Sequence, residues 1–169
     1  MEDRYHVRVR YTMSEKLHDK LKEYAEHEGL SVESCVKLFL WHQICFYNTE
    51  PERFQELWNN RKHFKGIKSY YIRIPLNFER KLKEVAKELN TRPSILNGKM
   101  AIMELDDILS HYACLDKETQ KNKVTINLSD TVWGKMKSLA EDINVPMNAY
   151  ISDVLLGYLI EYYPGFGEE

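Results

Sequence analysis

The sequence predicts a mainly α-helical protein with short β-strands, built from three tandem copies of one strand–helix–helix unit. Three stretches align without gaps around one alanine each, at Ala25, Ala86 and Ala140. In every stretch, alternating apolar and polar residues are followed by apolar residues at helical spacing, which marks a change from strand to helix. The expected units are residues 4–47, 68–111 and 122–163, with a helical connector at 48–67 and a loop at 112–121.

Each unit is expected to begin with a strand that has one apolar and one polar face. In the first unit Val9 and Tyr11 turn inward, whereas Arg8 and Arg10 turn outward. This follows because successive side chains of a strand point to opposite faces. The inward sets are Val9, Tyr11 and Met13; Tyr70, Ile72 and Ile74; and Val124, Ile126 and Leu128.

Two helices follow the strand in each unit. A Gly or Asn lies four residues after the aligned alanine, at Gly29, Asn90 and Asn144, and is expected to end the first helix in a left-handed conformation. The apolar stripes of the first helices predict the face that packs on the core. They are Leu17, Leu21 and Tyr24; Phe78, Leu82 and Val85; and Val132, Met136 and Leu139. The second helices are expected to begin near Ser31, Ser94 and Asn148, which are N-cap residue types.

The first connector has its own helix signals. Thr49 and Glu52 have the spacing of a capping box, and Pro51 suits a first helical turn. The apolar residues expected to pack this short helix onto the body are Phe54, Leu57 and Trp58.

A single unit cannot be stable alone. About forty-five residues bury too small a core, and a lone strand leaves its backbone hydrogen-bonding groups unpaired. Two units that pair strand to strand as an antiparallel ribbon solve both problems. Because three is an odd number, the remaining strand is expected to pair with that of a second copy, which predicts a homodimer.

The composition excludes several classes of protein. With 169 residues, 43% hydrophobic, the chain is expected to be folded throughout, and 24 Lys and Arg nearly balance 26 Asp and Glu. No stretch resembles a signal peptide or is long enough to cross a membrane, so we expect a cytoplasmic protein. The three cysteines, Cys35, Cys45 and Cys114, are too few for a disulfide framework or a zinc motif.

The repeated pattern resembles the ribbon-helix-helix superfamily of DNA-binding regulators, the MetJ, Arc and CopG type, most closely in residues 123–159. The resemblance implies three tandem ribbon-helix-helix units whose ribbons, formed within the chain and across a homodimer, enter the major groove of double-stranded DNA. The implied base-contacting residues are Arg8, Arg10, Thr12, Ser69, Tyr71, Arg73, Lys123, Thr125 and Asn127. The implied phosphate-contacting residues, at the starts of the second helices, are Ser31, Val32, Ser34, Ser94 and Asn148.

Catalytic and metal chemistry find little support in the sequence. It contains no glycine-rich phosphate loop and no nucleophile with an evident base, so we expect neither an enzyme nor a cofactor. His42 and Cys45 lie one helical turn apart, but no second pair with matching spacing accompanies them, and we expect both to be packing residues.

Two functions stay open at this point. The first is a sequence-specific transcriptional repressor of a prokaryote, plasmid or virus. The second is a protein-interaction module on the same scaffold, such as an antitoxin or an inhibitor of a host or phage factor, whose protein partner is unknown. The near-neutral net charge of −2 favours the second, whereas the basic strand face favours the first.

Overall fold

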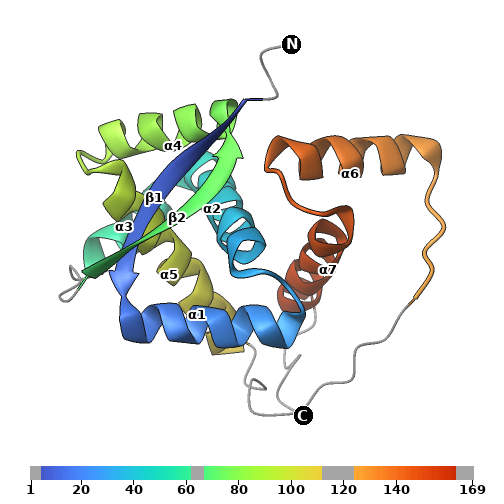
Figure 1. The fold of residues 1–169 in the computed structure, drawn as a ribbon, viewed down its shortest axis with the longest axis horizontal. Coiled ribbons are helices and arrows are strands. Elements are labelled where there is room, and N and C mark those ends of the chain that lie inside the picture. Colours follow the sequence, from blue (N-terminus) through green and yellow to red (C-terminus); the bar gives the residue numbers. More distant parts are fainter. Residues whose placement is uncertain (1–4, 62–66, 112–123, 163–169) are drawn as a thin grey trace.

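The computed structural model describes residues 5–61, 67–111 and 124–162, which form seven helices and one two-stranded sheet. Their order is β1 (His6–Ser14), α1 (Glu15–Glu28), α2 (Val32–Thr49), α3 (Pro51–Asn60), β2 (Ile67–Pro75), α4 (Leu76–Glu88), α5 (Pro93–His111), α6 (Asp130–Asp142) and α7 (Met147–Tyr162), as Figure 1 shows.

The prediction of three tandem ribbon-helix-helix units is wrong. Only the first two units contribute strands to the described part of the chain, and the third consists of α6 and α7 preceded by an irregular segment at residues 124–129. That segment alternates in sequence like a strand. However, a strand also needs a neighbour for its backbone N–H and C=O groups, and side-chain alternation does not supply one. The described residues therefore form a helical fold with a single two-stranded ribbon.

The pairing of the two strands is symmetric with respect to the first two copies of the repeat. β1 and β2 are antiparallel, and Arg10 lies opposite Tyr71, the residue at the same place in the second copy. Arg8 lies opposite Arg73, which corresponds to Thr12 of the first copy. The first two units are thus related by a local two-fold axis at the Arg10–Tyr71 pair, and they are the two units that pair within the chain.

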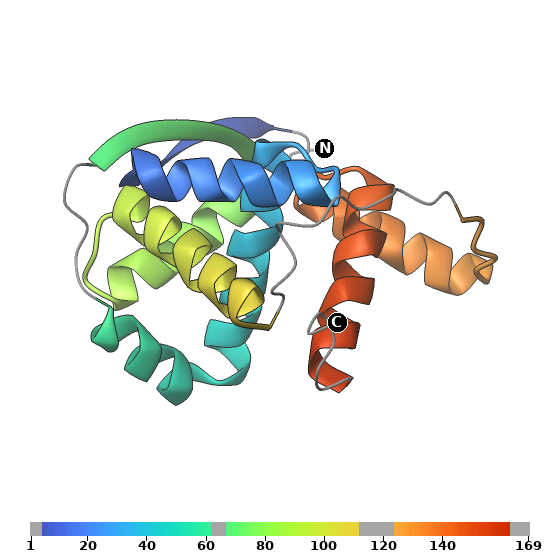
Figure 2. The same cartoon turned by 90° about the horizontal axis from the view of Figure 1, so that it is seen from below.

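The ribbon lies along one face of the body, with α3 at the opposite side (Figure 2). The second helices, α2 and α5, pack on each other in the core, which includes Phe39, Leu40 and Met100. The inward strand residues Tyr11, Ile72 and Ile74 are also buried there. The predicted inward faces of the first two strands are thus confirmed.

Helix α5 holds β1 at unusually short range. The Asn97 amide donates to the carbonyl of Arg10 at 3.0 Å, and the Thr12 hydroxyl donates to the carbonyl of Ser94 at 3.1 Å. Gly98 faces the Thr12 backbone so closely that a Cβ at this position would overlap the Thr12 carbonyl oxygen. A glycine is therefore required here by the approach of helix to strand.

The predicted ends of the first helices are confirmed. Gly29, Asn90 and Asn144 have φ angles of 71°, 50° and 55°, all in the left-handed region. Asparagine tolerates this conformation better than most residues, because its short side chain can hydrogen-bond locally. The second helices begin at Val32, with Ser31 as N-cap, and at Pro93 and Met147.

The connector helix α3 differs in detail from its prediction. Pro51 is its first residue, as expected, but the capping box does not form, because the Thr49 hydroxyl donates back to the carbonyl of Cys45. Phe54 and Trp58 are buried, whereas Leu57 is 46% exposed, so its predicted packing is wrong. The predicted loop at residues 112–121 lies outside the described residues.

The third unit is attached to the body through α7 and the turn that precedes it. The Lys37 ammonium donates to the carbonyl of Asn144 at 3.1 Å. The His42 ring lies between two carboxylates, with Nδ1 2.8 Å from Glu104 Oε1 and Nε2 2.6 Å from Asp153 Oδ2, so it joins α2, α5 and α7. Across the described ranges, no helix has the length and apolar content needed to cross a membrane.

Candidate nucleic-acid interface

The outer face of the ribbon is basic and accessible. Arg8 and Arg10 on β1, and Tyr71 and Arg73 on β2, all have exposed side chains, as does Ser69. Neither strand contains an acidic residue. The local two-fold places Arg8 and Arg73 opposite each other beside the central Arg10–Tyr71 pair. A chain with a net charge of −2 therefore concentrates three guanidinium groups on one short ribbon.

Tyr71 orients one of these arginines. The Arg8 guanidinium carbon lies 3.9 Å from the centre of the Tyr71 ring, which is a cation–π contact between the two strands. Stacking on the ring restricts the guanidinium plane but leaves its N–H edges free to donate. Tyr71, which is 49% exposed, thus orients Arg8 for a ligand that binds the outer face of the ribbon.

Not all of the predicted base-contacting residues lie on this face. Thr12 is 9% exposed, and its hydroxyl is used in the packing of β1 on α5. Thr125 and Asn127 are exposed, but they lie on the irregular segment before α6. Lys123 lies outside the described residues. The structure therefore brings together Arg8, Arg10, Ser69, Tyr71 and Arg73 on the exposed face of the ribbon, whereas Thr12 is buried and Thr125 and Asn127 lie off the ribbon.

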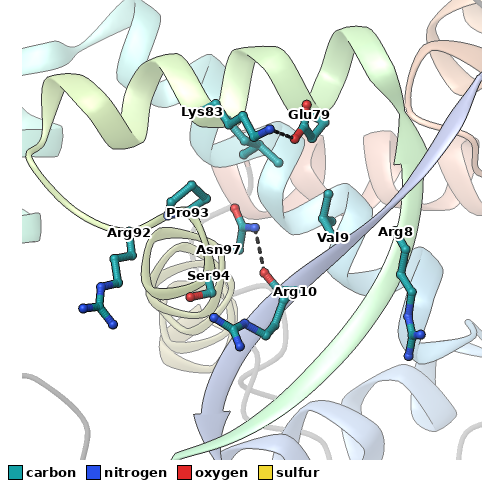
Figure 3. Close-up of a pocket in the computed structure, with 10 residues that line it drawn as sticks. Arg8, Val9, Arg10, Glu79, Lys83, Arg92, Pro93, Ser94 and Asn97 are labelled. Atoms are coloured by element: carbon teal, nitrogen blue, oxygen red, sulfur yellow. Dashed lines mark hydrogen bonds and ion pairs between the residues drawn. The ribbon is translucent and has the colours of Figure 1, made fainter.

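A cavity of about 380 Å³ opens beside the ribbon, between β1, α4 and the start of α5. Figure 3 shows Arg10 and Arg92 on either side of the first turn of α5. Glu79, the one acidic residue among those that line this cavity, is paired with Lys83. In the described part of the chain no carboxylate pairs with Arg10 or Arg92, so the rim of the cavity is positively charged and continuous with the ribbon face.

The two second helices offer unequal anion sites at their N-termini. At α2, Glu33 accepts hydrogen bonds from the Arg73 N–H at 2.8 Å and from Lys37 at 3.2 Å. Burial by itself would raise the pKa of Glu33, but these bonds and the Lys37 charge hold it below its usual value. A fixed negative charge thus stands at the start of α2. The corresponding residue of α5 is Ser94, which is neutral.

The predicted phosphate-contacting residues have differing environments. The Ser31 hydroxyl accepts from the Ser34 N–H, which makes it the N-cap of α2. Ser34 and Ser94 are both 8% exposed, so both residues are largely inaccessible to a phosphate. Val32 is half-buried, and Asn148 is exposed on α7, outside the two units that form the ribbon.

Sequence reasoning missed the basic residues beside the ribbon, Arg92 and Lys83. Neither lies on a strand, and their approach to Arg10 depends on the tertiary positions of α4 and α5. His42 also has partners that its spacing from Cys45 did not indicate, namely Glu104 and Asp153. Among the residues that the structure describes, no group of three or more His, Cys, Asp or Glu side chains is arranged to hold a metal ion.

The chain matches no protein-family model, no curated protein and no solved structure. Any functional conclusion therefore depends on the sequence pattern and on the geometry of the ribbon.

Proposed function

We propose that this protein binds double-stranded DNA through the outer face of the β1–β2 ribbon and acts as a sequence-specific transcriptional regulator. The observation that supports the proposal is a two-stranded ribbon that carries three exposed arginines and no acidic residue. The resemblance of the sequence to ribbon-helix-helix regulators points to the same surface.

The ribbon has suitable dimensions and chemistry for the major groove. That groove admits a two-stranded ribbon, and an arginine can donate two hydrogen bonds to the O6 and N7 atoms of guanine. Arg8, Arg10 and Arg73 supply such donors at neighbouring positions on both strands. Tyr71, which holds Arg8 by stacking, would set the angle at which that guanidinium meets a base edge.

Phosphate contacts would be stronger on one side of the ribbon. Arg92, just before α5, supplies a cation beside Arg10. On the other side, Glu33 places a carboxylate at the start of α2. We therefore expect an asymmetric footprint in which the α5 side lies closer to the DNA backbone.

The test begins with selection of bound duplexes from a random-sequence pool, followed by fluorescence titration of the selected duplex. Replacement of both Arg8 and Arg10 by Ala should weaken binding at least tenfold, because each good arginine contact contributes about 1–3 kcal/mol. The dependence of affinity on salt should also become shallower, since fewer phosphate charges are neutralised.

A matched control removes two positive charges far from the ribbon. Arg53 on α3 and Lys137 on α6 are exposed and form ion pairs with Glu50 and Glu141, and Arg53 also lies 6.0 Å from the centre of the Phe46 ring. Their joint replacement by Ala should leave affinity unchanged within about twofold, because neither residue lies on the ribbon or lines the cavity beside it. The proposal is refuted if the wild type retains no duplex from the pool, or if both double variants bind like the wild type.

A further inference from the structure

Helix α7 exposes apolar side chains on more than one side. From Val154 to Ile160 it contains no charged residue, yet Val154 is 43% and Leu155 is 51% exposed. Helices that are apolar all round are normally buried. Large exposed apolar side chains are also concentrated in the third unit, where Val132 and Trp133 of α6 add to them.

In the other two units, the surface that corresponds to this face of α7 is buried. Val154 corresponds to Phe39 of α2 and Met100 of α5, which are 1% and 0% exposed. Leu155 corresponds to Leu40 and Ala101, which are equally buried. They are buried because α2 and α5 pack on each other, whereas α7 contacts α6 and one side of α2.

We infer that a second copy of this chain covers the exposed face of α7, so that the third units of two chains pack on each other through their helices. In the body, the second helices of two related units meet about a local two-fold axis. Among the described residues, no second helix packs on the face of α7 that corresponds to the buried faces of α2 and α5, and a surface that matches this face is its own equivalent in another copy. Such a contact is self-complementary, as two-fold dimers require.

This contact is formed between helices and does not need residues 124–129 to become a strand. It is also independent of DNA, so it can be tested without the proposed function. Failure of one proposal leaves the other unchanged.

Gly157 provides a sharp test of the inferred contact. It corresponds to His42 and Met103, and His42 lies where α2 meets α5 through Glu104. A Cβ added at Gly157 would meet no atom within 4 Å in a single chain. A large charged side chain therefore fits the isolated protein but would lie inside the proposed interface.

The experiment measures molar mass by light scattering and sedimentation across a micromolar concentration series. We expect the wild type to reach twice the 20.1 kDa mass of one chain. Gly157→Glu and Leu155→Lys should each weaken association at least tenfold. Gly157→Glu should keep its helical circular dichroism, because Glu has a higher helix propensity than Gly.

Leu57→Lys is the matched control, because Leu57 is a similarly exposed apolar residue on α3. It should leave the mass unchanged. The inference is overturned if the wild type stays monomeric over the whole series. It is equally overturned if the wild type associates and Gly157→Glu associates as tightly, because the contact then lies elsewhere.

Discussion

The closest contact between the ribbon and the body can be tested by one methyl group. Gly98→Ala adds a Cβ that would overlap the Thr12 carbonyl oxygen and lie 2.8 Å from its carbonyl carbon. The obstacle is backbone, so no change of rotamer relieves it. Helix α5 and β1 must therefore move apart.

The expected loss in the free energy of unfolding follows from the contacts that this movement disturbs. Overpacking of a close contact costs about 1–3 kcal/mol. Separation also weakens the bonds from Asn97 to Arg10 and from Thr12 to Ser94, at about 0.5–1.5 kcal/mol each. Alanine regains about 1 kcal/mol through its higher helix propensity. The net destabilisation is about 3 kcal/mol, which corresponds to a loss of about 10 °C in Tm for a chain of this size.

The assay is urea and thermal unfolding followed by circular dichroism, with Gly134→Ala as the control. Gly134 also lies within a helix, but a Cβ added there meets nothing within 4 Å. The control should therefore gain up to about 1 kcal/mol. Equal stabilisation by both substitutions would show that α5 does not approach β1 as closely as described.

Two further predictions concern charge. Burial lowers the pKa of His42, but hydrogen bonds to Asp153 and Glu104 and their charges raise it well above its ordinary value of 6.5. The stability that this group contributes should be fully present below about pH 6.5 and be lost as pH rises through the raised pKa. In His42→Gln, the urea midpoint should therefore depend less on pH over that range. An unchanged pH dependence would contradict the assignment. Glu33→Gln removes the carboxylate beside the ribbon. If the ribbon binds DNA, this variant should bind a few-fold more tightly at low salt. Glu52→Gln on α3 is the control and should leave the affinity unchanged.

Local chemistry explains most of what could be predicted. The left-handed residues Gly29, Asn90 and Asn144 were located from the repeat, because a helix end depends on a few adjacent residues. Strand alternation likewise predicted that Arg8 and Arg10 face outward. These features require no knowledge of distant parts of the chain.

Other features depend on neighbours that are distant in sequence. By alternation, Thr12 should point outward from its strand. However, α5 approaches the strand closely at Gly98, and the Thr12 hydroxyl donates to the carbonyl of Ser94 in that helix. Arg92 joins the basic surface only because α5 begins beside β1. His42 has carboxylate partners from two other helices, which its local spacing could not indicate.

The sequence by itself determined the three-fold repeat, the helix ends and the basic face of the first strand, because each depends on residues close together in the chain. The tertiary structure decided which strands exist. Residues 124–129 have the same alternation as β1, but β1 has β2 beside it, whereas no described residue pairs with the later segment as a strand. Since backbone hydrogen bonds between strands join distant segments, a strand pattern becomes a strand only where the fold supplies its partner.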